Sequence, residues 1–177
     1  GRIQADGGAG TFYGGGGAGG GIRLTAGTLT GAGRVVANGG AGGGQSGGGG
    51  GGRVAIVCPV PIGLSLTNVT ANGAPGYGIG GAGTVHVRQG NVAPTLVVRG
   101  SDRETPLPSL KADEHLILDG ARVVTTQLTA ARLVLTNGAV LTHPMNDLGS
   151  EQFLELSVVD LVIDAGSTID VSARGYL

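Results

Sequence analysis

The chain has 177 residues, a formal net charge of −1, 40% hydrophobic residues and only 3% aromatic residues, with no tryptophan. This hydrophobic content is sufficient for a packed domain and argues against a disordered chain. The near-neutral charge argues against a nucleic-acid partner, which would need a basic surface, and no apolar run approaches the roughly 20 residues of a membrane-spanning helix. With so few aromatic rings, the core must be filled by Val, Leu, Ile and Ala side chains, which favours thin layers.

Glycine is concentrated in the first half of the chain, because 32 of the 39 glycines lie in the range 1–83. The glycine-rich tracts open with similar motifs at nearly equal intervals: ADGG begins at position 5, ANGG at 37 and ANGA at 71. Each tract leads into a strand-like run, again at equal intervals: GIRL begins at position 21, GRVA at 52 and GTVH at 83. A constant period between about 20 and 50 residues is typical of repeat proteins, in which each unit buries a face against the next.

Two interpretations of the glycine tracts compete. Flexible linkers are the usual role of Gly-rich sequence. The tracts have similar lengths of 15, 14 and 11 residues, however, and free linkers have no reason to keep in step with the repeats. We therefore predict ordered tracts in polyproline II geometry, in which the glycine run 47–52 would extend about 19 Å. Without Cβ atoms, tracts of successive repeats could approach and form main-chain hydrogen bonds worth about 1 kcal/mol each.

The segments between the tracts have a β pattern. Residues 22–37 and 53–71 are rich in Val, Ile, Leu and Thr, with apolar alternation in parts, which predicts strands. The single cysteine, Cys58, cannot form an internal disulfide and is predicted to be a buried core residue. Residues 1–89 are therefore predicted to form β-solenoid repeats with a period of about 32 residues.

The second half of the chain contains less glycine. Residues 90–115 hold three of the seven prolines and several charges, and are predicted to be an excursion or a seam between two halves of one domain. Residues 116–177 are predicted to continue the solenoid. Three segments there share an apolar run, a turn dipeptide and a second run: 116–126, 133–143 and 161–171. The Asp-Gly, Asn-Gly and Ala-Gly dipeptides supply the positive φ of a solenoid corner, and they suit hairpins equally well.

Both ends of the sequence lie inside the repeat pattern. GRIQADGG at 1–8 is similar to GRVVANGG at 33–40, so the chain begins within a repeat. Residues 171–177 can be aligned with residues 69–75, so a further repeat starts where the sequence stops. We expect the chain to be a segment of a longer repetitive protein that continues, or self-associates, at both ends.

The short β runs, the Asn-Gly and Asp-Gly corners and the regular spacing of the repeats resemble the right-handed parallel β-helix of bacterial surface proteins, including large adhesins and autotransporter passengers. AGTLTGAGRVVANGGAGGG, from residue 26, and GGGGGGRVAI, from residue 47, are similar to glycine-rich repeats of very long bacterial surface proteins, gliding and predatory species among them. The tracts also resemble those of phage tail-tip adhesins, which form a polyglycine II bundle that presents variable loops.

The resemblance implies an all-β fold, specifically a right-handed parallel β-helix whose ordered glycine-rich loops pack as polyglycine II. It implies a non-enzymatic structural module of a long extracellular fibre or a cell-surface adhesin, located outside the cell, with surface glycans as candidate ligands. Two alternatives remain: a fragment of a polysaccharide-degrading β-helix enzyme, and the receptor-binding tip of a phage or host adhesin.

An enzyme of that kind needs clustered carboxylates, for calcium binding or for acid–base chemistry. Asp160, Asp164 and Asp170 are the best local candidates, but a corner at Ala165-Gly166 separates the third, and we interpret all three as turn or surface residues. The histidines lack the spacing of metal ligands and are interpreted as ordinary surface or strand residues: His86, His115 and His143. We predict no catalytic residue, no metal site and no cofactor.

Three aromatic residues lie inside the glycine tracts: Phe12, Tyr13 and Tyr77. Anchoring of a loop to the solenoid is the favoured interpretation, and presentation of ring faces that stack on a sugar ligand is the other. Four arginines recur beside the tracts: Arg2, Arg23, Arg34 and Arg53. Their guanidinium groups either donate to carbonyls at the tract ends or lie solvated at strand edges.

Overall fold

The structure is a computed structural model and describes residues 1–107, 111–147 and 149–175. Its regular elements are β-strands, apart from one short 3-10 helix, η1 (Leu66–Asn68), so the predicted all-β class is confirmed for these residues. None of the described residues belongs to a helix that is long and apolar enough to cross a membrane.

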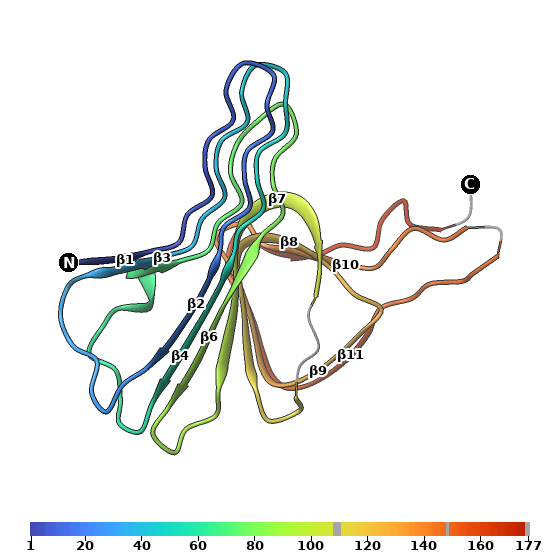
Figure 1. The fold of residues 1–177 in the computed structure, drawn as a ribbon. Coiled ribbons are helices and arrows are strands. Elements are labelled where there is room, and N and C mark those ends of the chain that lie inside the picture. Colours follow the sequence, from blue (N-terminus) through green and yellow to red (C-terminus); the bar gives the residue numbers. More distant parts are fainter. Residues whose placement is uncertain (108–110, 148, 176–177) are drawn as a thin grey trace.

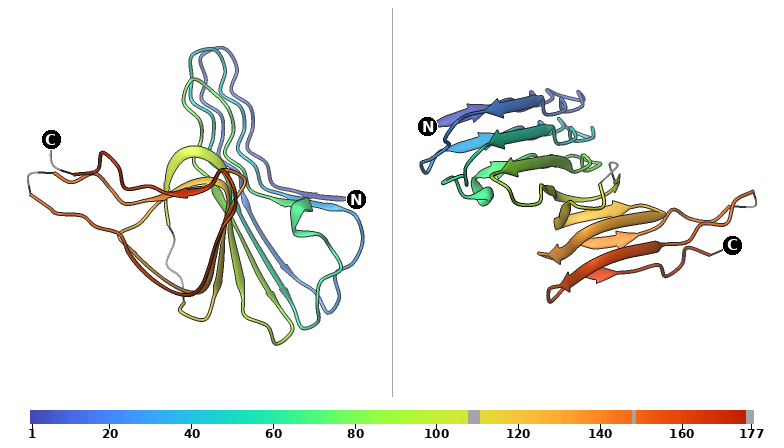
Figure 2. Two further views of the ribbon diagram at one scale, coloured as in Figure 1. Left: turned by 180° about the vertical axis from the view of Figure 1, so that it is seen from behind. Right: turned by 90° about the horizontal axis from the view of Figure 1, so that it is seen from below.

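The smaller sheet has three parallel strands, in the order β1 (Arg2–Gln4), β3 (Arg34–Val36) and β5 (Val69–Thr70). Arg2 is paired with Arg34, and Val35 with Val69, so equivalent residues are 32 and 34 positions apart. These are the intervals between the ADGG, ANGG and ANGA motifs. The predicted repeats therefore lie on top of one another in register, as layers (Figure 2).

The larger sheet has nine strands. Seven follow one another in this order: β2 (Gly21–Thr25), β4 (Arg53–Cys58), β6 (Gly83–Gln89), β7 (Thr95–Pro106), β8 (His115–Val124), β9 (Gln127–Thr136) and β11 (Glu155–Ile163). Two more lie off this path: β10 (Val140–Thr142), which pairs with β8, and β12 (Thr168–Ile169), which pairs with β10. Gly21 pairs with Arg53 and Arg53 with Thr84, which confirms that the strands after the glycine tracts stack in parallel.

Turn dipeptides in the second half form corners. Asn137 and Gly138 have φ values of 55° and 76°, between β9 and β10. A hairpin would pair these two strands with each other, but β10 pairs in parallel with β8 and β12 instead. At Gly120, with φ 57°, the chain bends within β8. The corner interpretation is therefore confirmed here, and the hairpin interpretation is wrong.

Residues 90–115 differ from the predicted excursion, because nearly half of them form β7 in the middle of the sheet. Three consecutive apolar residues, Leu96, Val97 and Val98, are buried, and their burial on both faces holds this segment in the sheet despite its prolines. The segment is also a seam, since β7 is antiparallel to β6 and parallel to β8. Residues 108–110 lie outside the described residues.

Two hydrophobic cores lie on opposite faces of the nine-stranded sheet. The first core lies between the two sheets and contains Val54, Val85 and Val97. The second contains Leu96 and Val98, with residues of β8, β9 and β10. Strand β7 contributes side chains to both cores. The face of the sheet that carries the core therefore changes at this strand. The cysteine is 2% exposed and unpaired, which confirms the predicted core position of Cys58.

The glycine tracts form three long loops that project together beyond the sheets (Figure 1): glycine loop 1 (5–20), glycine loop 2 (37–52) and glycine loop 3 (71–82). Every third amide of a loop limb donates to the next loop. The N–H of Gly16 donates to the carbonyl of Gly47 at 3.0 Å, and that of Gly19 to Gly50 at 2.9 Å. The tracts are therefore ordered, as predicted, and the linker interpretation is wrong.

Close approach of main chains explains the glycine content. A Cβ added to Gly16 would lie 1.8 Å from the carbonyl oxygen of Gly40, and one added to Gly49 would lie 1.9 Å from that of Gly17. Real Cβ atoms essentially never approach another heavy atom within 3.0 Å. Any side chain at these positions would force the loops apart and break their hydrogen bonds.

The recurring Asp or Asn at the start of each loop forms a ladder. Asp6 Oδ1 accepts from the N–H of Asn38 at 2.7 Å, and Asn38 Oδ1 accepts from the N–H of Asn72 at 2.8 Å. The ladder ends at Asn72 Oδ1, which is buried without a hydrogen-bond partner in the described part of the chain. The ADGG, ANGG and ANGA motifs thus set the register between layers.

Candidate functional site

The tips of the three glycine loops lie side by side. The hydroxyl of Ser46 donates to the carbonyl of Tyr13, and the N–H of Tyr77 donates to the carbonyl of Ser46 at 2.9 Å. Tyr13, Ser46 and Tyr77 are therefore linked at the tips of three successive layers, although the register equivalent of Tyr13 in the second layer is Gln45 rather than Ser46. At the roughly 4.8 Å spacing of hydrogen-bonded strands, the two tyrosines belong to layers about 10 Å apart.

The aromatic side chains at these tips are exposed. The exposed fractions are 88% for Phe12, 80% for Tyr13 and 85% for Tyr77. Side chains that anchored the loops to the sheets would be buried, so the favoured anchoring interpretation is wrong. We call these three residues the aromatic row. Their free ring faces are of the kind that stack on flat apolar surfaces, including the faces of sugar rings.

The backbone of Phe12 is in the left-handed region, with φ 52°. The equivalent residue of glycine loop 2 is Gly44, with φ 53°. This conformation costs a residue with a Cβ about 1–2 kcal/mol, whereas glycine adopts it freely. The tip turn thus holds a bulky ring where its neighbouring layer has glycine, and such strain is characteristic of functional positions.

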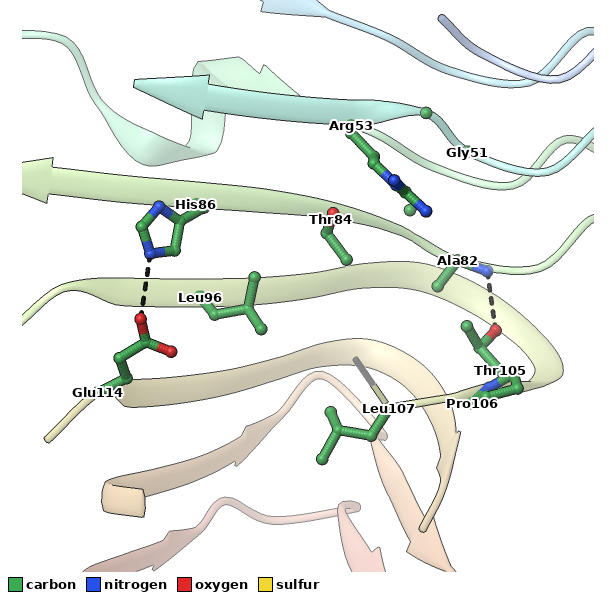
Figure 3. A pocket seen from close by; sticks show the side chains of 12 residues that line it. Gly51, Arg53, Ala82, Thr84, His86, Leu96, Thr105, Pro106, Leu107 and Glu114 are labelled. Atoms are coloured by element: carbon green, nitrogen blue, oxygen red, sulfur yellow. Dashed lines mark hydrogen bonds and ion pairs between the residues drawn. The ribbon is translucent and has the colours of Figure 1, made fainter. Parts of the chain in front are cut away.

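A second candidate is an open cavity of about 710 Å³ (Figure 3). It lies between the face of β4 and β6 that points away from the first core and Leu96, a residue of the second core. His86 Nε2 lies 3.4 Å from Glu114 Oε1 on its wall. Glu114 is 9% exposed, and its Oε2 accepts from the N–H of Lys111 at 3.2 Å. Arg53 also lines the cavity.

This cavity offers limited chemistry. Among its described lining residues, the titratable groups are one imidazole, one carboxylate and one guanidinium: His86, Glu114 and Arg53. Glycoside hydrolysis uses two carboxyl groups, one as acid and one as base or nucleophile. The sequence could not reveal the His86–Glu114 pair, because the two residues are 28 positions apart and meet only through the reversal at β7.

The three aspartates singled out in the sequence lie on different elements. Asp160 is within β11 and pairs with Arg132 at 3.2 Å, whereas Asp164 follows β11 and Asp170 follows β12. The N–H of Ser172 donates to Asp170 and lowers the pKa of its carboxyl group. In the described ranges, no group of three His, Cys, Asp or Glu side chains is arranged to hold a metal ion.

The other histidines and the arginines singled out in the sequence lie on strands or contact neighbouring residues, and among the described residues none of them belongs to a candidate ligand cluster with the aromatic row. His115 lies within β8, as interpreted. The interpretation of His143 as a surface or strand residue is wrong, because it follows β10 and is 7% exposed, with its Nδ1 2.6 Å from the carbonyl oxygen of Pro144. Arg2 donates to the carboxylate of Asp6 at 2.9 Å rather than to a tract carbonyl. The other three arginines beside the tracts are exposed at their strands, as the alternative of solvated strand edges requires: Arg23, Arg34 and Arg53.

One ionic cluster joins distant layers. Glu104 accepts from Arg174, which is 8% exposed, and lies 3.3 Å from Arg122 Nε. The hydrogen bond from Arg174, with the positive charges of both arginines, lowers the pKa of Glu104. No pattern in the sequence indicated this contact, because Glu104 and Arg174 are 70 positions apart.

Comparisons of the chain with protein-family models, with curated proteins and with solved structures found no match. Geometry alone therefore distinguishes the two candidate sites, the aromatic row and the cavity at His86 and Glu114. The aromatic row combines exposed rings, a strained backbone at Phe12 and positions at the tips of the first and third glycine loops. It is the better candidate for ligand binding.

Proposed function

We propose that this chain is a non-enzymatic structural module of a long extracellular fibre or cell-surface adhesin, of the glycine-rich repeat type found in large bacterial surface proteins. One observation carries the proposal. Main chains of successive glycine loops are hydrogen-bonded to each other at three-residue intervals, so that each layer is fastened to its neighbours far from the cores. A protein that needed only a catalytic groove would have no use for this second, backbone-only layer.

The three-residue interval supports polyglycine II packing. A polyproline II helix has three residues per turn, so every third N–H points toward the same neighbour. Gly7 and Gly10 donate to Asn38 and Ala41 in the next layer, at 2.8 Å each. Gly17 donates instead to Gly8, on the other limb of the same loop. Each limb thus bonds to neighbours in several directions, which resists bending of the stack.

The strand pairing supports a solenoid, and we infer a right-handed parallel β-helix. Layers follow one another in parallel register on both sides of β7. At β7 the strand direction reverses and the core moves to the other face of the sheet. Reversing the strand direction alone would invert the hand of the coil, and so would moving the core to the other face alone, so the two changes together leave the hand the same. We infer a right-handed coil because parallel crossover connections are right-handed in about 98% of cases.

The adhesin part of the proposal rests on the aromatic row. Rings at the tips of a stiff stack are held clear of the sheets, where they can contact another surface. Surface glycans are the ligand class that we propose for Tyr13 and Tyr77, because two rings carried by layers about 10 Å apart suit a chain of sugar rings. The receptor-binding tip of an adhesin is the alternative that uses the same residues.

A polysaccharide-degrading enzyme is the weaker alternative. Its carboxylate pair would have to come from the aspartates of β11 and β12, which lie on different elements, or from the cavity at Glu114, where one carboxylate is described. Neither arrangement matches the paired acids that such chemistry needs.

Hydrogen exchange of the intact chain tests the structural proposal. The amides of Gly16, Gly19 and Gly51, which donate between loops, should exchange as slowly as those of β4. Fast exchange at all three would mean that the loops are not a packed layer, and the fibre proposal would fail.

A further inference from the structure

The stack of glycine loops has two edges of unlike chemistry. At glycine loop 3 the edge is closed by β7, and three hydrogen bonds close it: Gly73 N–H to Gly100 O at 3.1 Å, Ser101 Oγ to Gly80 O at 2.6 Å, and Ala82 N–H to Thr105 Oγ1 at 2.9 Å. Glycine loop 1 has no such cover in the described part of the chain. The edge at glycine loop 3 is therefore already covered by β7, whereas the edge at glycine loop 1 can still take up a further layer.

The sheets are also open at this end. Strand β1 pairs only with β3, and β2 pairs only with β4, so each has an unpaired edge among the described strands. All three residues of β1 are exposed, and Ile3 is 43% exposed. Ile22 and Leu24 of β2 pack on the first core but are only half-buried. An uncovered core beside unpaired strand edges is a template for another strand.

The main-chain groups of glycine loop 1 repeat the pattern that loops 2 and 3 use. In loop 2, four carbonyls accept from the preceding layer: Asn38, Ala41, Gly47 and Gly50. Their equivalents, 32 positions earlier, are Asp6, Ala9, Gly15 and Ala18, and none of these carbonyls accepts a main-chain hydrogen bond in the described structure. The N–H groups of Gly40 and Gly43 donate to loop 1, whereas those of their equivalents, Gly8 and Thr11, have no main-chain acceptor there.

Gly8 adds a steric argument that is independent of these hydrogen bonds. A Cβ on its equivalent, Gly40, would lie 2.1 Å from the carbonyl oxygen of Gly8, so glycine is required there by the preceding layer. A Cβ on Gly8 would meet nothing within 4 Å, and its φ is not positive. Nothing in this structure requires glycine at position 8. A layer placed against loop 1, as loop 1 is placed against loop 2, would require it.

We propose that this open edge, formed by β1, glycine loop 1 and β2, binds a further glycine-rich layer of polypeptide with the spacing of residues 1–32. The inference rests on the proposed function and deepens it by assigning the partner and the direction of growth. The partner has glycine at the places equivalent to Gly16 and Gly19, where its main chain meets loop 1. Its amides donate to the four open carbonyls, and its carbonyls accept from Gly8 and Thr11.

A second copy of this chain is a poorer fit for the edge. In register, the copy would have to present glycine loop 3, and its own β7 already covers that loop. Two copies could meet only through their open edges. A contact between two open edges cannot repeat the parallel register seen between glycine loops 1 and 2.

The test adds a layer to the intact chain. A second copy of residues 1–32 is placed before Gly1, which gives the junction Ala32-Gly1 in place of the native Ala32-Gly33. We expect the amides of Gly8 and Thr11 to exchange roughly a hundredfold more slowly than in the unextended chain, and as slowly as Gly40 and Gly43. Unchanged exchange at Gly8 and Thr11 in the extended chain would overturn the proposal.

A matched pair of substitutions checks that docking causes the protection. Gly8→Ala should leave exchange in loops 2 and 3 unaltered in the unextended chain, and should return Thr11 to fast exchange in the extended one. Retained protection of Thr11 would mean that the added layer lies elsewhere. A dimer of the unextended chain in sedimentation, with Gly8 already protected, would assign the edge to a second copy. If loops 2 and 3 themselves exchange fast, it is the proposed function that fails, and not this inference alone.

Discussion

Leu96 and Val97 are neighbours in β7, yet their side chains belong to different hydrophobic cores. Leu96 packs with residues of β8 and β9, and Val97 packs with Val54 and Val85 of the glycine-loop half. Successive side chains of a strand point to opposite faces of the sheet. One strand covered on both faces is therefore sufficient to join two stacks that lie on opposite sides of a common sheet.

This relationship predicts different effects for two adjacent substitutions. Leu96→Ala should lower the free energy of unfolding by about 2–4 kcal/mol and reduce hydrogen-exchange protection mainly in β8 and β9. Val97→Ala should lower it by about 2 kcal/mol and act mainly on β4 and β6. The control is Val92→Ala, at a side chain that is 62% exposed. Equal losses of protection in both halves for both variants would contradict the assignment of two cores.

Steric contact between the glycine loops predicts an intolerance of alanine that depends on position. Gly49→Ala should lower the free energy of unfolding by about 3 kcal/mol or more, because its Cβ would lie 1.9 Å from a carbonyl oxygen. Gly21→Ala is the matched control, since a Cβ there meets nothing within 4 Å. It should change stability by no more than about 0.5 kcal/mol. Urea denaturation followed by circular dichroism measures both, and similar values for the two variants would argue against tight loop packing.

The aromatic row predicts a loss of binding without a loss of stability. If surface glycans are the ligand, the double variant Tyr13→Ala/Tyr77→Ala should bind about 30-fold more weakly on a glycan array, from about 1 kcal/mol per ring. Its thermal midpoint should stay unchanged because both side chains are at least 80% exposed. Phe153→Ala, at an exposed ring far along the chain, is the control. Equal binding by the double variant and the native chain would remove the row from consideration.

The strained tip predicts that stability and binding change in opposite directions at one residue. Phe12→Gly should raise the free energy of unfolding by about 1 kcal/mol, since glycine adopts a φ of 52° without steric cost. The same change should weaken glycan binding because it removes an exposed ring. Chemical denaturation and the array would measure the two effects. A destabilised Phe12→Gly variant would show that the ring supports the loop after all.

The cluster at Glu104 predicts a dependence of stability on pH. Its folded-state pKa lies below the ordinary value of 4.5, chiefly through the hydrogen bond from Arg174. A lowered carboxyl pKa stabilises the fold above the unfolded-state value, and this contribution is lost as the pH falls through the lower folded-state value. Glu104→Gln should therefore destabilise the chain at pH 7 and approach the native stability near pH 3.

The magnitude will be modest, because the side chain of Glu104 is 44% exposed and the interaction is screened by solvent. Urea midpoints at several pH values between 3 and 7 measure the effect. Glu151→Gln, at an exposed glutamate in the same half, is the control substitution. A pH-independent difference between native chain and Glu104→Gln would show that the cluster acts by packing alone.

The regular half of the fold could be predicted because its signals are local and periodic. The nearly equal intervals between ADGG, ANGG and ANGA became the pairing of Arg2 with Arg34 and of Val35 with Val69. Tracts of similar length implied that they stack, and they do. The candidate site was predicted only in part. The three aromatic residues were identified, but their exposure was not, since a ring in a glycine tract can fold back or point outward with the same sequence.

Sequence alone determined the all-β class, the spacing of the layers and the need for glycine where main chains meet, because side-chain size, turn chemistry and period are properties of the chain itself. Only the tertiary structure decided that β7 reverses the strand direction, that the core changes faces there, and that Glu114 meets His86 and Glu104 meets Arg174. The physical reason is that an apolar run such as Leu96 to Val98 fits a strand in either direction and on either face. Its direction is chosen by what the neighbouring layers leave uncovered, and those layers lie far away in the sequence.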